Sequence, residues 1–202
     1  SLSYALNIPL INVHHMKAHI LANFIDDPKP NFPFLCLTVS GGHTQIIKVI
    51  GPLEMIELGN TIDDAVGEAF DKAAKLLGFP YPGGPFIDKY AKKGDSNRFQ
   101  FAESNVSGLN FSFSGIKTSL LYFLKDQQKH SPNFIQENIH DICASYQQHL
   151  ISMLMKKLVL ASNETGIKEI ALAGGVAANS ELRLQLSKLS EQYNWSSYIP
   201  DF

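Results

Sequence analysis

Arginine is scarce in this sequence: only Arg98 and Arg183 occur among 202 residues. Lysine and arginine together number 17 against 19 acidic residues, so the formal net charge is −2. Proteins that bind nucleic acid through bulk charge carry a clear basic excess, and this composition excludes that class. Any nucleic-acid surface must therefore be local, built from lysine, or supplied by a partner or by sequence outside this chain.

Long apolar runs and a secretion signal are also absent. No stretch approaches the roughly 20 apolar residues of a membrane-spanning helix, and no signal peptide is visible at the N-terminus. We therefore expect a cytoplasmic protein that has no membrane partner. The chain lacks an initiator methionine and begins and ends within apparent secondary-structure elements, so we also expect it to be truncated at both ends.

Cysteine and nucleophile motifs are sparse as well. The two cysteines, Cys36 and Cys143, lie in the apolar runs FLCLTV and DICASY and have no metal-ligand spacing. Buried, reduced thiols are therefore favoured over a disulfide. No GxSxG motif, CxxC motif or Ser-His-Asp order is present, so covalent hydrolase chemistry has no support.

Apolar runs and amphipathic segments alternate along the chain. Short buried runs predict strands at 8–13, 34–39 and 44–50, with a β-hairpin turn at SGGH between the last two. Alternating Phe and Ser residues predict a further strand at 108–115. Helices are expected at 14–25, 61–79, 87–94, 116–128 and 133–166, and a strand, glycine turn and helix at 169–189. This order predicts a mixed α/β fold.

Three glycine pairs interrupt this pattern, in VSGGHT (39–44), YPGGP (81–85) and LAGGVAAN (172–179). Glycine lets a ligand approach the backbone amides closely, and amides that converge at a turn or a helix N-terminus form an anion site. A single pair usually marks an ordinary turn, whereas three pairs make nucleotide or phosphate binding an equal alternative. Asn179, which follows the third pair, either caps the next helix or orients a bound sugar or base.

His15 and His19, in VHHMKAHI, lie four residues apart and therefore on one face of the predicted helix. Two imidazoles at this spacing can bind one transition metal, although a purely structural pair of helix histidines is the commoner case. Met16 follows His15 where the helical zinc-protease motif has glutamate. The general base of that protease chemistry is therefore missing from this helix.

The helix predicted over 61–79 is acidic along one stripe, and we expect Thr61 to be its N-cap. The acidic residues of this stripe are Asp64, Glu68 and Asp71. One interpretation is a solvated face with an ion pair between Asp71 and Lys75. The other is a carboxylate that reaches a ligand hydroxyl beside the glycine turns.

Five stretches occur in the order seen in one protein family: HHMKAH, VSGGHTQII, TIDDAVGEAFDKAAKLLGFPYPGGP, NFSFSGIKT and AGGVAANSELR. With these motifs the chain resembles the tRNA threonylcarbamoyladenosine transferase family (TsaD), formerly called O-sialoglycoprotein endopeptidase or glycoprotease. The resemblance spans nearly the whole chain, and the wording is most similar to bacterial members.

The resemblance implies a duplicated actin-like, sugar-kinase-like ATPase architecture, which is a ribonuclease H-like α/β fold and is incomplete in this chain. Residues 1–50 would hold the end of the first lobe and the start of the second lobe's hairpin. Residues 51–202 would form the second lobe with a helical insert, truncated before the final metal-ligand motif.

The resemblance also implies an enzyme, an N(6)-L-threonylcarbamoyladenine synthase. Such an enzyme transfers the threonylcarbamoyl group from threonylcarbamoyl-adenylate to the exocyclic amine of the adenosine next to the tRNA anticodon. The implied partners are tRNA, a paralogous small subunit and a P-loop ATPase, with a homodimer as a further expected assembly. The alternatives are a metal-dependent O-sialoglycoprotein endopeptidase and a non-catalytic scaffold paralogue. We expect the fragment by itself to be inactive.

Site residues follow from the resemblance motif by motif. His15 and His19 match ligands of one divalent metal ion, iron or zinc, whose third ligand is an Asp outside this chain. Lys17 departs from the family, which often has an acidic residue there. No catalytic side chain is assigned. The residues that match contacts to the adenylate, or to an ATP-like nucleotide, are Thr38, Val39, Ser40, Gly41, Gly42, Asp71, Gly84, Asp88 and Asn179.

Overall fold

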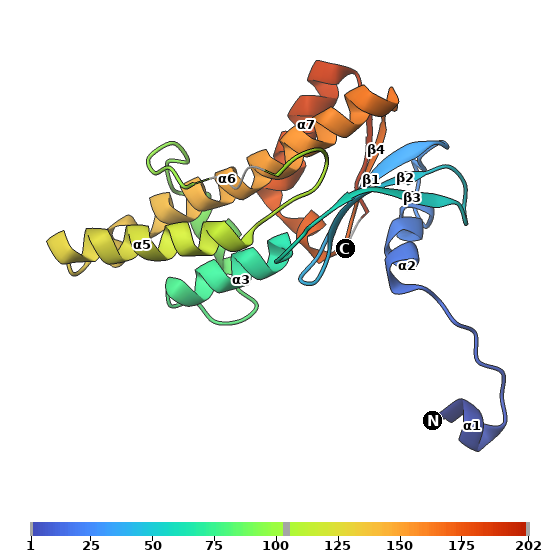
Figure 1. Cartoon of the computed structure of the whole chain (residues 1–202), viewed down its shortest axis with the longest axis horizontal. Coiled ribbons are helices and arrows are strands. Elements are labelled where there is room, and N and C mark those ends of the chain that lie inside the picture. Colours follow the sequence, from blue (N-terminus) through green and yellow to red (C-terminus); the bar gives the residue numbers. More distant parts are fainter. Residues whose placement is uncertain (1, 103–105, 201–202) are drawn as a thin grey trace.

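The computed structural model describes residues 2–102 and 106–200, which contain one five-stranded mixed sheet with helices on both of its faces (Figure 1). The strands lie in the order β3-β2-β1-β4-β5. Their bounds are β1 Phe34–Val39, β2 Thr44–Val49, β3 Met55–Asn60, β4 Glu169–Ala173 and β5 Ser196–Tyr198. Strands β1, β2 and β3 pair antiparallel, whereas β4 pairs parallel with both β1 and β5. This sheet confirms the predicted mixed α/β class.

Strand β1 is the centre of the sheet, and all six of its residues are buried. Its side chains alternate between two cores, as the two-residue period of a strand requires. Leu35 and Leu37 face the larger core, and Phe34 and Cys36 face a smaller one on the opposite side of the sheet. The antiparallel pairing of β1 with β2 confirms the hairpin predicted for residues 34–50.

Helices cover the two faces unequally. The larger core takes its helical side chains from α3, α4, α5, α6 and α7, whereas α2 contributes Ile20 to the smaller core. In Figure 1, α3, α5 and α6 extend to one side of the sheet and α2 lies on the other. The helices are α1 Leu2–Leu6, α2 His15–Leu21, η1 Ala22–Phe24, α3 Val66–Leu76, α4 Gly84–Ala91, α5 Ser114–His130, α6 Phe134–Thr165, η2 Gly175–Ala178 and α7 Ser180–Tyr193. None of those in the described ranges combines the length and the hydrophobicity that crossing a membrane needs.

Helix α6 is the longest element and positions the helices around it. It runs over 32 residues without a break and ends where Gly166 adopts a φ of 70°, a left-handed conformation that glycine adopts without strain. The hydroxyl of Tyr146 on α6 donates to the carbonyl oxygen of Ala69 on α3 at 3.2 Å. Gly94 lies so close to α6 that a Cβ there would collide with the carbonyl group of His140.

The strand predicted for residues 8–13 is wrong. These residues run as an extended segment between α1 and α2, away from the sheet (Figure 1). Leu10 and Ile11 are 80% and 84% exposed. An extended backbone becomes a strand only when a neighbour supplies the hydrogen-bond ladder, and none of the strands described here pairs with this segment.

The strand predicted for residues 108–115 is also wrong. Phe111 forms a single bridge with Thr61, and α5 already begins at Ser114. Alternation of Phe and Ser suggested one buried and one exposed face. Phe111, Ser112 and Phe113 are instead all buried, so the segment is a buried loop that enters α5.

Helix α3 begins later than predicted, and Thr61 is not its N-cap. The Thr61 hydroxyl donates to the carbonyl oxygen of Asp64 at 2.5 Å and so closes a turn before the helix. The N-cap position belongs to Ala65, which has no capping side chain. The first helical N–H, that of Val66, donates instead to the Thr44 hydroxyl of β2 at 2.9 Å. A residue from a distant strand therefore supplies the cap.

The predicted division of the chain at residue 50 stays a prediction. Strands β1 and β2 precede that point and β3, β4 and β5 follow it, yet all five belong to one sheet.

Candidate functional site

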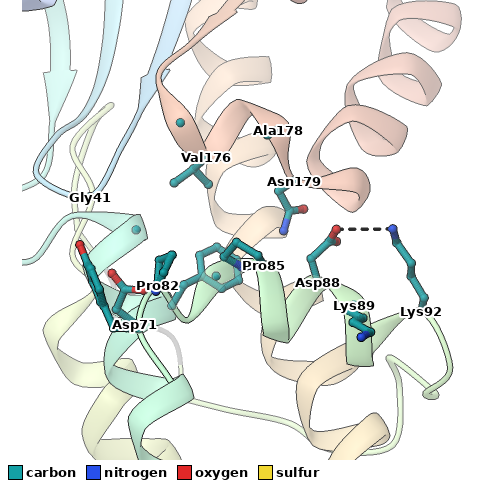
Figure 2. Close-up of a pocket in the computed structure, with 15 residues that line it drawn as sticks. Gly41, Asp71, Pro82, Pro85, Asp88, Lys89, Lys92, Val176, Ala178 and Asn179 are labelled. Atoms are coloured by element: carbon teal, nitrogen blue, oxygen red, sulfur yellow. Dashed lines mark ion pairs between the residues drawn. The ribbon is translucent and has the colours of Figure 1, made fainter. Parts of the chain in front are cut away.

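A pocket of about 480 Å³ lies where the turns that follow β1 and β4 meet (Figure 2). These two strands are parallel neighbours, so their carboxyl ends lie at the same edge of the sheet. Open α/β sheets bind their ligands at this edge, and the volume falls within the range of about 300 to 1,000 Å³ that is usual for small-molecule sites. Four segments line the pocket: the turn after β1, helix α3, the segment 81–92, and the η2–α7 junction.

The turn after β1 is closed by its own first and last residues. The N–H of Ser40 donates to the carbonyl of His43 at 2.9 Å, and the His43 N–H donates to the Ser40 hydroxyl at 3.1 Å. In the described part of the chain, the N–H groups of Gly41 and Gly42 have no such partner. Both glycines are exposed, and Gly41 lines the pocket. The turn therefore holds a free amide at the pocket wall.

Gly67, in the first turn of α3, brings this helix against the glycine turn. Its N–H donates to the carbonyl oxygen of Ser40 at 3.2 Å. A Cβ at Gly67 would lie 2.5 Å from that same oxygen, a distance at which the backbone must move. The absence of a side chain here lets the N-terminal end of α3 form part of the pocket.

Asp71 joins α3 to the second glycine pair. Its Oδ1 accepts a hydrogen bond from the N–H of Gly83 at 2.7 Å. The predicted partner, Lys75, is exposed on the same helix, and the ion pairs of the acidic stripe are made by Lys72, to Asp64 at 2.5 Å and to Glu68 at 2.9 Å. These two hydrogen-bonded carboxylates raise the pKa of the Lys72 ammonium. Asp71 thus keeps its second oxygen at the pocket.

Asp88, on α4, is tied to two other elements of the pocket. Its Oδ1 accepts from the Ser180 hydroxyl at 2.7 Å, and its Oδ2 lies 3.6 Å from the ammonium of Lys92 (Figure 2). Lys89 and Lys92 also line the pocket. The α4 side of the pocket therefore combines one carboxylate, held in place by the start of α7, with two cations.

The structure confirms the prediction that Asn179 caps the following helix. Asn179 also lies in the pocket wall. Its Oδ1 accepts from the N–H of Leu182 at 3.0 Å, so it is the N-cap of α7. Its Nδ2 donates to Oε1 of Gln147 on α6 at 2.8 Å. Figure 2 shows Asn179 and Val176 across the pocket from Pro82 and Asp71.

The apolar walls of the pocket were not predicted from the sequence. They come from Phe70, Tyr81, Pro82, Pro85 and Val176. Tyr81 is 84% exposed, so its ring is open to a ligand at the pocket. The glycine pair of the segment YPGGP (81–85), with Gly84 as a ligand contact, was predicted from the sequence, and the aromatic residue of that segment was the available signal for its apolar wall.

The predicted ligand residues do not all meet. Gly41, Asp71, Gly84, Asp88 and Asn179 line the pocket. The other predicted contacts, which are Thr38, Val39, Ser40 and Gly42, do not line it.

Thr38 and Val39 belong to the buried strand that leads to the pocket. Thr38 is fully buried, and its hydroxyl lies 3.8 Å from the sulfur of Cys36, on the α2 side of the sheet. Val39 is buried in the larger core, and its carbonyl lies against Gly174, whose φ of 88° suits glycine. Both residues therefore position the glycine turns around the pocket.

His15 and His19 converge on each other on α2. Their Nε2 atoms are 3.1 Å apart, and the two rings meet edge to face with centroids 4.4 Å apart. Metal–imidazole bonds are about 2.0–2.1 Å long, so one ion could contact both nitrogens. Within residues 2–102 and 106–200, no group of three or more His, Cys, Asp or Glu side chains could hold a metal. The pair fits two ligands of a metal site, and neither histidine lines the pocket.

Asp63 joins the segment before α3 to the motif NFSFSGIKT. Its carboxylate accepts from the N–H of Phe113 at 2.7 Å and from the hydroxyls of Ser112 and Ser114 at 2.6 and 2.8 Å. Burial raises the pKa of Asp63, but these hydrogen bonds outweigh it and the net pKa is lowered. The carboxylate thus caps the N-terminus of α5 from another part of the chain.

Both cysteines are free and buried, as predicted. Burial raises the pKa of Cys36 to about 12, only partly offset by the Thr38 hydroxyl, and burial raises that of Cys143 to about 12. A thiol is nucleophilic only as the thiolate. Neither cysteine therefore provides a nucleophile near neutral pH.

Solved structures with the same arrangement define the fold class. Full-length HypF, in a phosphate- and nucleotide-bound crystal form, matches 96% of this chain and 34% of its own with a TM-score of 0.71 and 13% sequence identity. Component A of the (R)-2-hydroxyglutaryl-CoA dehydratase of Acidaminococcus fermentans matches 96% of this chain and 64% of its own, with a TM-score of 0.56 and 15% identity. At these identities the likeness concerns the fold alone. The chain has the actin-like α/β fold that was predicted, and the described residues contain one sheet of it.

The family is given by sequence comparison. The family model for TsaD, tRNA N6-adenosine threonylcarbamoyltransferase, matches residues 1–202. Curated relatives carrying that name are 55% identical over the whole chain in Christiangramia forsetii and 58% identical over 98% of it in Cytophaga hutchinsonii. This chain belongs to the TsaD family. It spans 60% and 58% of the length of these two relatives.

Proposed function

We propose that this protein is a tRNA-modifying acyltransferase. It moves the threonylcarbamoyl group of threonylcarbamoyl-adenylate onto the exocyclic amine of the adenosine next to the tRNA anticodon. The single observation that carries this proposal is the pocket at the carboxyl ends of β1 and β4, where all three glycine pairs converge. Membership of a family named for this reaction supports it.

The adenylate occupies the pocket in an orientation that its walls suggest. The base lies against the apolar side chains of Tyr81, Pro85 and Val176, among which the Tyr81 ring offers a flat aromatic surface. The phosphate lies toward the free amide of Gly41, because amides at such turns bind anions. Lys92 adds a positive charge on the α4 side. The free oxygen of Asp71 accepts a hydrogen bond from a ligand hydroxyl.

The reaction needs little covalent help from the protein. The adenosine amine attacks the carbamoyl carbon, a new C–N bond forms, the C–O bond to the phosphate breaks, and AMP leaves while the amine loses a proton. An aromatic amine is a poor nucleophile, so positioning the two reactants should supply much of the rate. Amides at the glycine turn stabilise the negative charge that develops on the reacting oxygens.

A divalent metal ion, iron or zinc, is part of the proposal. His15 and His19 would supply two ligands, because their Nε2 atoms already lie 3.1 Å apart. When bound, such an ion would supply Lewis-acid chemistry. Replacement of both histidines by alanine should remove the metal that co-purifies with the protein, as measured by plasma mass spectrometry. A double variant with unchanged metal content would show that the pair is structural.

Partners follow from the same reaction. The tRNA is the acceptor, and with two arginines in the chain its backbone is held largely by lysines and by other subunits. We propose that these subunits are a paralogue of this protein and a P-loop ATPase, that a homodimer is a further assembly, and that the complex works in the cytoplasm.

The test compares two Asp→Asn variants of the protein expressed from the complete gene. Asp71→Asn keeps the Oδ1 that accepts from Gly83 but removes the charge that faces the ligand. Asp126→Asn is the matched control, because Asp126 is exposed on α5 and pairs with Lys129. Threonylcarbamoyl-adenylate and unmodified tRNA are supplied with the partner subunits, and modified adenosine is measured by mass spectrometry of the digested tRNA.

We expect modification by the wild type and the Asp126 variant. The Asp71 variant should be slower by about 10- to 150-fold, because a hydrogen bond to a charged group contributes about 1.5–3 kcal/mol. A wild-type protein that makes no modified adenosine would overturn the proposal. Chelator-sensitive cleavage of a sialoglycoprotein would favour the endopeptidase alternative. Modification of tRNA by the partner subunits in the absence of this protein's own activity would favour the scaffold alternative.

A further inference from the structure

Gln147 is a buried polar residue that reaches the pocket only through Asn179. It lies on α6 with 4% of its surface exposed. Its Oε1 accepts from Asn179 Nδ2 at 2.8 Å, over a separation of 32 residues. Gln147 does not line the pocket, whereas Asn179 does. A buried amide is retained in a core only when its hydrogen bonds are satisfied, so this pair is a defined contact between α6 and the start of α7.

The two hydrogen bonds of Asn179 fix the orientation of its carboxamide. Its Oδ1 accepts from the Leu182 N–H at 3.0 Å while Nδ2 donates to Gln147. A carboxamide has two donor hydrogens and two acceptor lone pairs. One N–H and one lone pair of Asn179 therefore remain for a ligand, in a direction set by the other two bonds. Without Gln147, the hydrogen bond from the Leu182 N–H would hold Oδ1 of Asn179, but no hydrogen bond to Gln147 would hold its Nδ2.

The same region of α6 also holds the opposite wall of the pocket. The neighbouring residue, Tyr146, donates to the carbonyl oxygen of Ala69 on α3 at 3.2 Å. Phe70 and Asp71, which line the pocket, follow directly on that helix. Consecutive residues of one rigid helix thus set the positions of two walls.

We propose that Gln147 is a positioning residue for ligand recognition: its side-chain carbonyl orients Asn179 so that one N–H of Asn179 points at the bound adenosine nucleotide. This inference rests on the proposed function. It adds a residue outside the pocket that determines affinity for the nucleotide without touching it.

The test is a double-mutant cycle in the protein expressed from the complete gene. Gln147→Met has a similar size and shape and lacks the carbonyl acceptor, and Gln147→Glu keeps an acceptor oxygen. Asn179→Ser keeps an N-cap oxygen and removes the carboxamide. KM for threonylcarbamoyl-adenylate, kcat and the melting temperature are measured for each single variant and for the Gln147→Met, Asn179→Ser pair.

We expect Gln147→Met to raise KM by about tenfold, the effect of one well-placed hydrogen bond, with kcat nearly unchanged. Gln147→Glu should restore KM toward the wild-type value. The double variant should be no worse than Asn179→Ser alone, because Gln147 then has nothing to orient. A KM unchanged in Gln147→Met, or a loss that adds fully to that of Asn179→Ser, would overturn the inference.

A second measurement does not depend on the reaction. In ¹⁵N-labelled protein, the side-chain amide signal of Asn179 is identified by its disappearance in Asn179→Ser. We expect one of its two protons to shift downfield in the wild type and to lose that shift in Gln147→Met. An unchanged signal contradicts the positioning role even if the enzyme is active, and a lost shift in a protein without transferase activity contradicts only the proposed function.

Discussion

Adding one methyl group at Gly41 separates the structural role of the glycine turn from its role in binding. A Cβ built at Gly41 has no neighbour within 4 Å, and the backbone there is outside the left-handed region that favours glycine. The folded protein therefore accommodates Gly41→Ala without moving. Replacing glycine by alanine at such a position stabilises a protein by about 0.4–1 kcal/mol, because the unfolded chain loses freedom.

The effect on binding should have the opposite sign. Gly41 lines the pocket, so the added methyl group occupies space that the ligand phosphate needs in order to reach the amide. The methyl group is small beside a pocket of about 480 Å³, so the cost comes from its position and not from lost volume. Forcing an extra carbon into a close contact costs about 1–3 kcal/mol, which corresponds to a roughly 5- to 150-fold weaker Kd.

The assay measures thermal unfolding and the Kd for an adenosine nucleotide on the same samples. Gly51→Ala is the matched control, because a Cβ there also meets nothing within 4 Å and Gly51 lies outside the pocket lining. Both variants should melt at or slightly above the wild-type temperature, and only Gly41→Ala should bind more weakly. The reasoning is refuted if Gly41→Ala binds as tightly as the control, since the turn would then not contact the ligand.

Three further predictions concern folding and reactivity. Gly67→Ala should lower stability by about 1–3 kcal/mol in chemical denaturation, because its Cβ would lie 2.5 Å from the Ser40 carbonyl oxygen; unchanged stability would mean that the turn moves freely. Asp63→Ala should cost about 1.5–3 kcal/mol, and the lowered pKa of Asp63 gives the sign with pH: the wild-type advantage is present above the unfolded-state pKa of about 3.9 and is lost as pH falls through the lower folded-state pKa. An advantage that does not decline as the pH falls below about 3.9 contradicts this cap. Cys36 and Cys143 should not react with a thiol reagent at pH 8 in the native protein and should both react in denaturant, since burial raises each pKa to about 12; rapid native labelling would contradict the buried positions.

Local patterns predicted the central elements well for two reasons. A helix makes its backbone hydrogen bonds within itself, and a buried strand is apolar in its own sequence. Five of the six residues in the run 34–39 are apolar, and the strand that they form is buried on both faces. The helix predicted over 133–166 forms as one helix, Phe134–Thr165, and Gly166 ends it. Asn179 has the residue type and position of an N-cap, and it is one.

Predictions failed where a distant residue supplies the deciding contact. Thr61 has the sequence of a cap, but Thr44 on β2 holds the first N–H of α3. Residues 111–113 have the alternation of a strand. The Asp63 carboxylate instead accepts hydrogen bonds from the Ser112 hydroxyl and the Phe113 N–H, and the segment leads into α5. The partners in these contacts lie 22 to 50 residues apart in the sequence. A short stretch of sequence therefore does not contain both of them.

The sequence alone determined strands β1, β2 and β4, the longer helices, the three glycine turns and the histidine pair, because spacing and residue type express backbone preference directly; strands β3 and β5 lie outside the ranges predicted as strands. Only the tertiary structure decided which of these features meet. Parallel pairing of β1 with β4 brings the first and third glycine turns to one edge, and the Asp71–Gly83 bond brings the second beside them. Because a strand buries alternate side chains on opposite faces, the sheet has a second, smaller core. Helix α2, which carries His15 and His19, packs Ile20 into that core, and neither histidine lines the pocket.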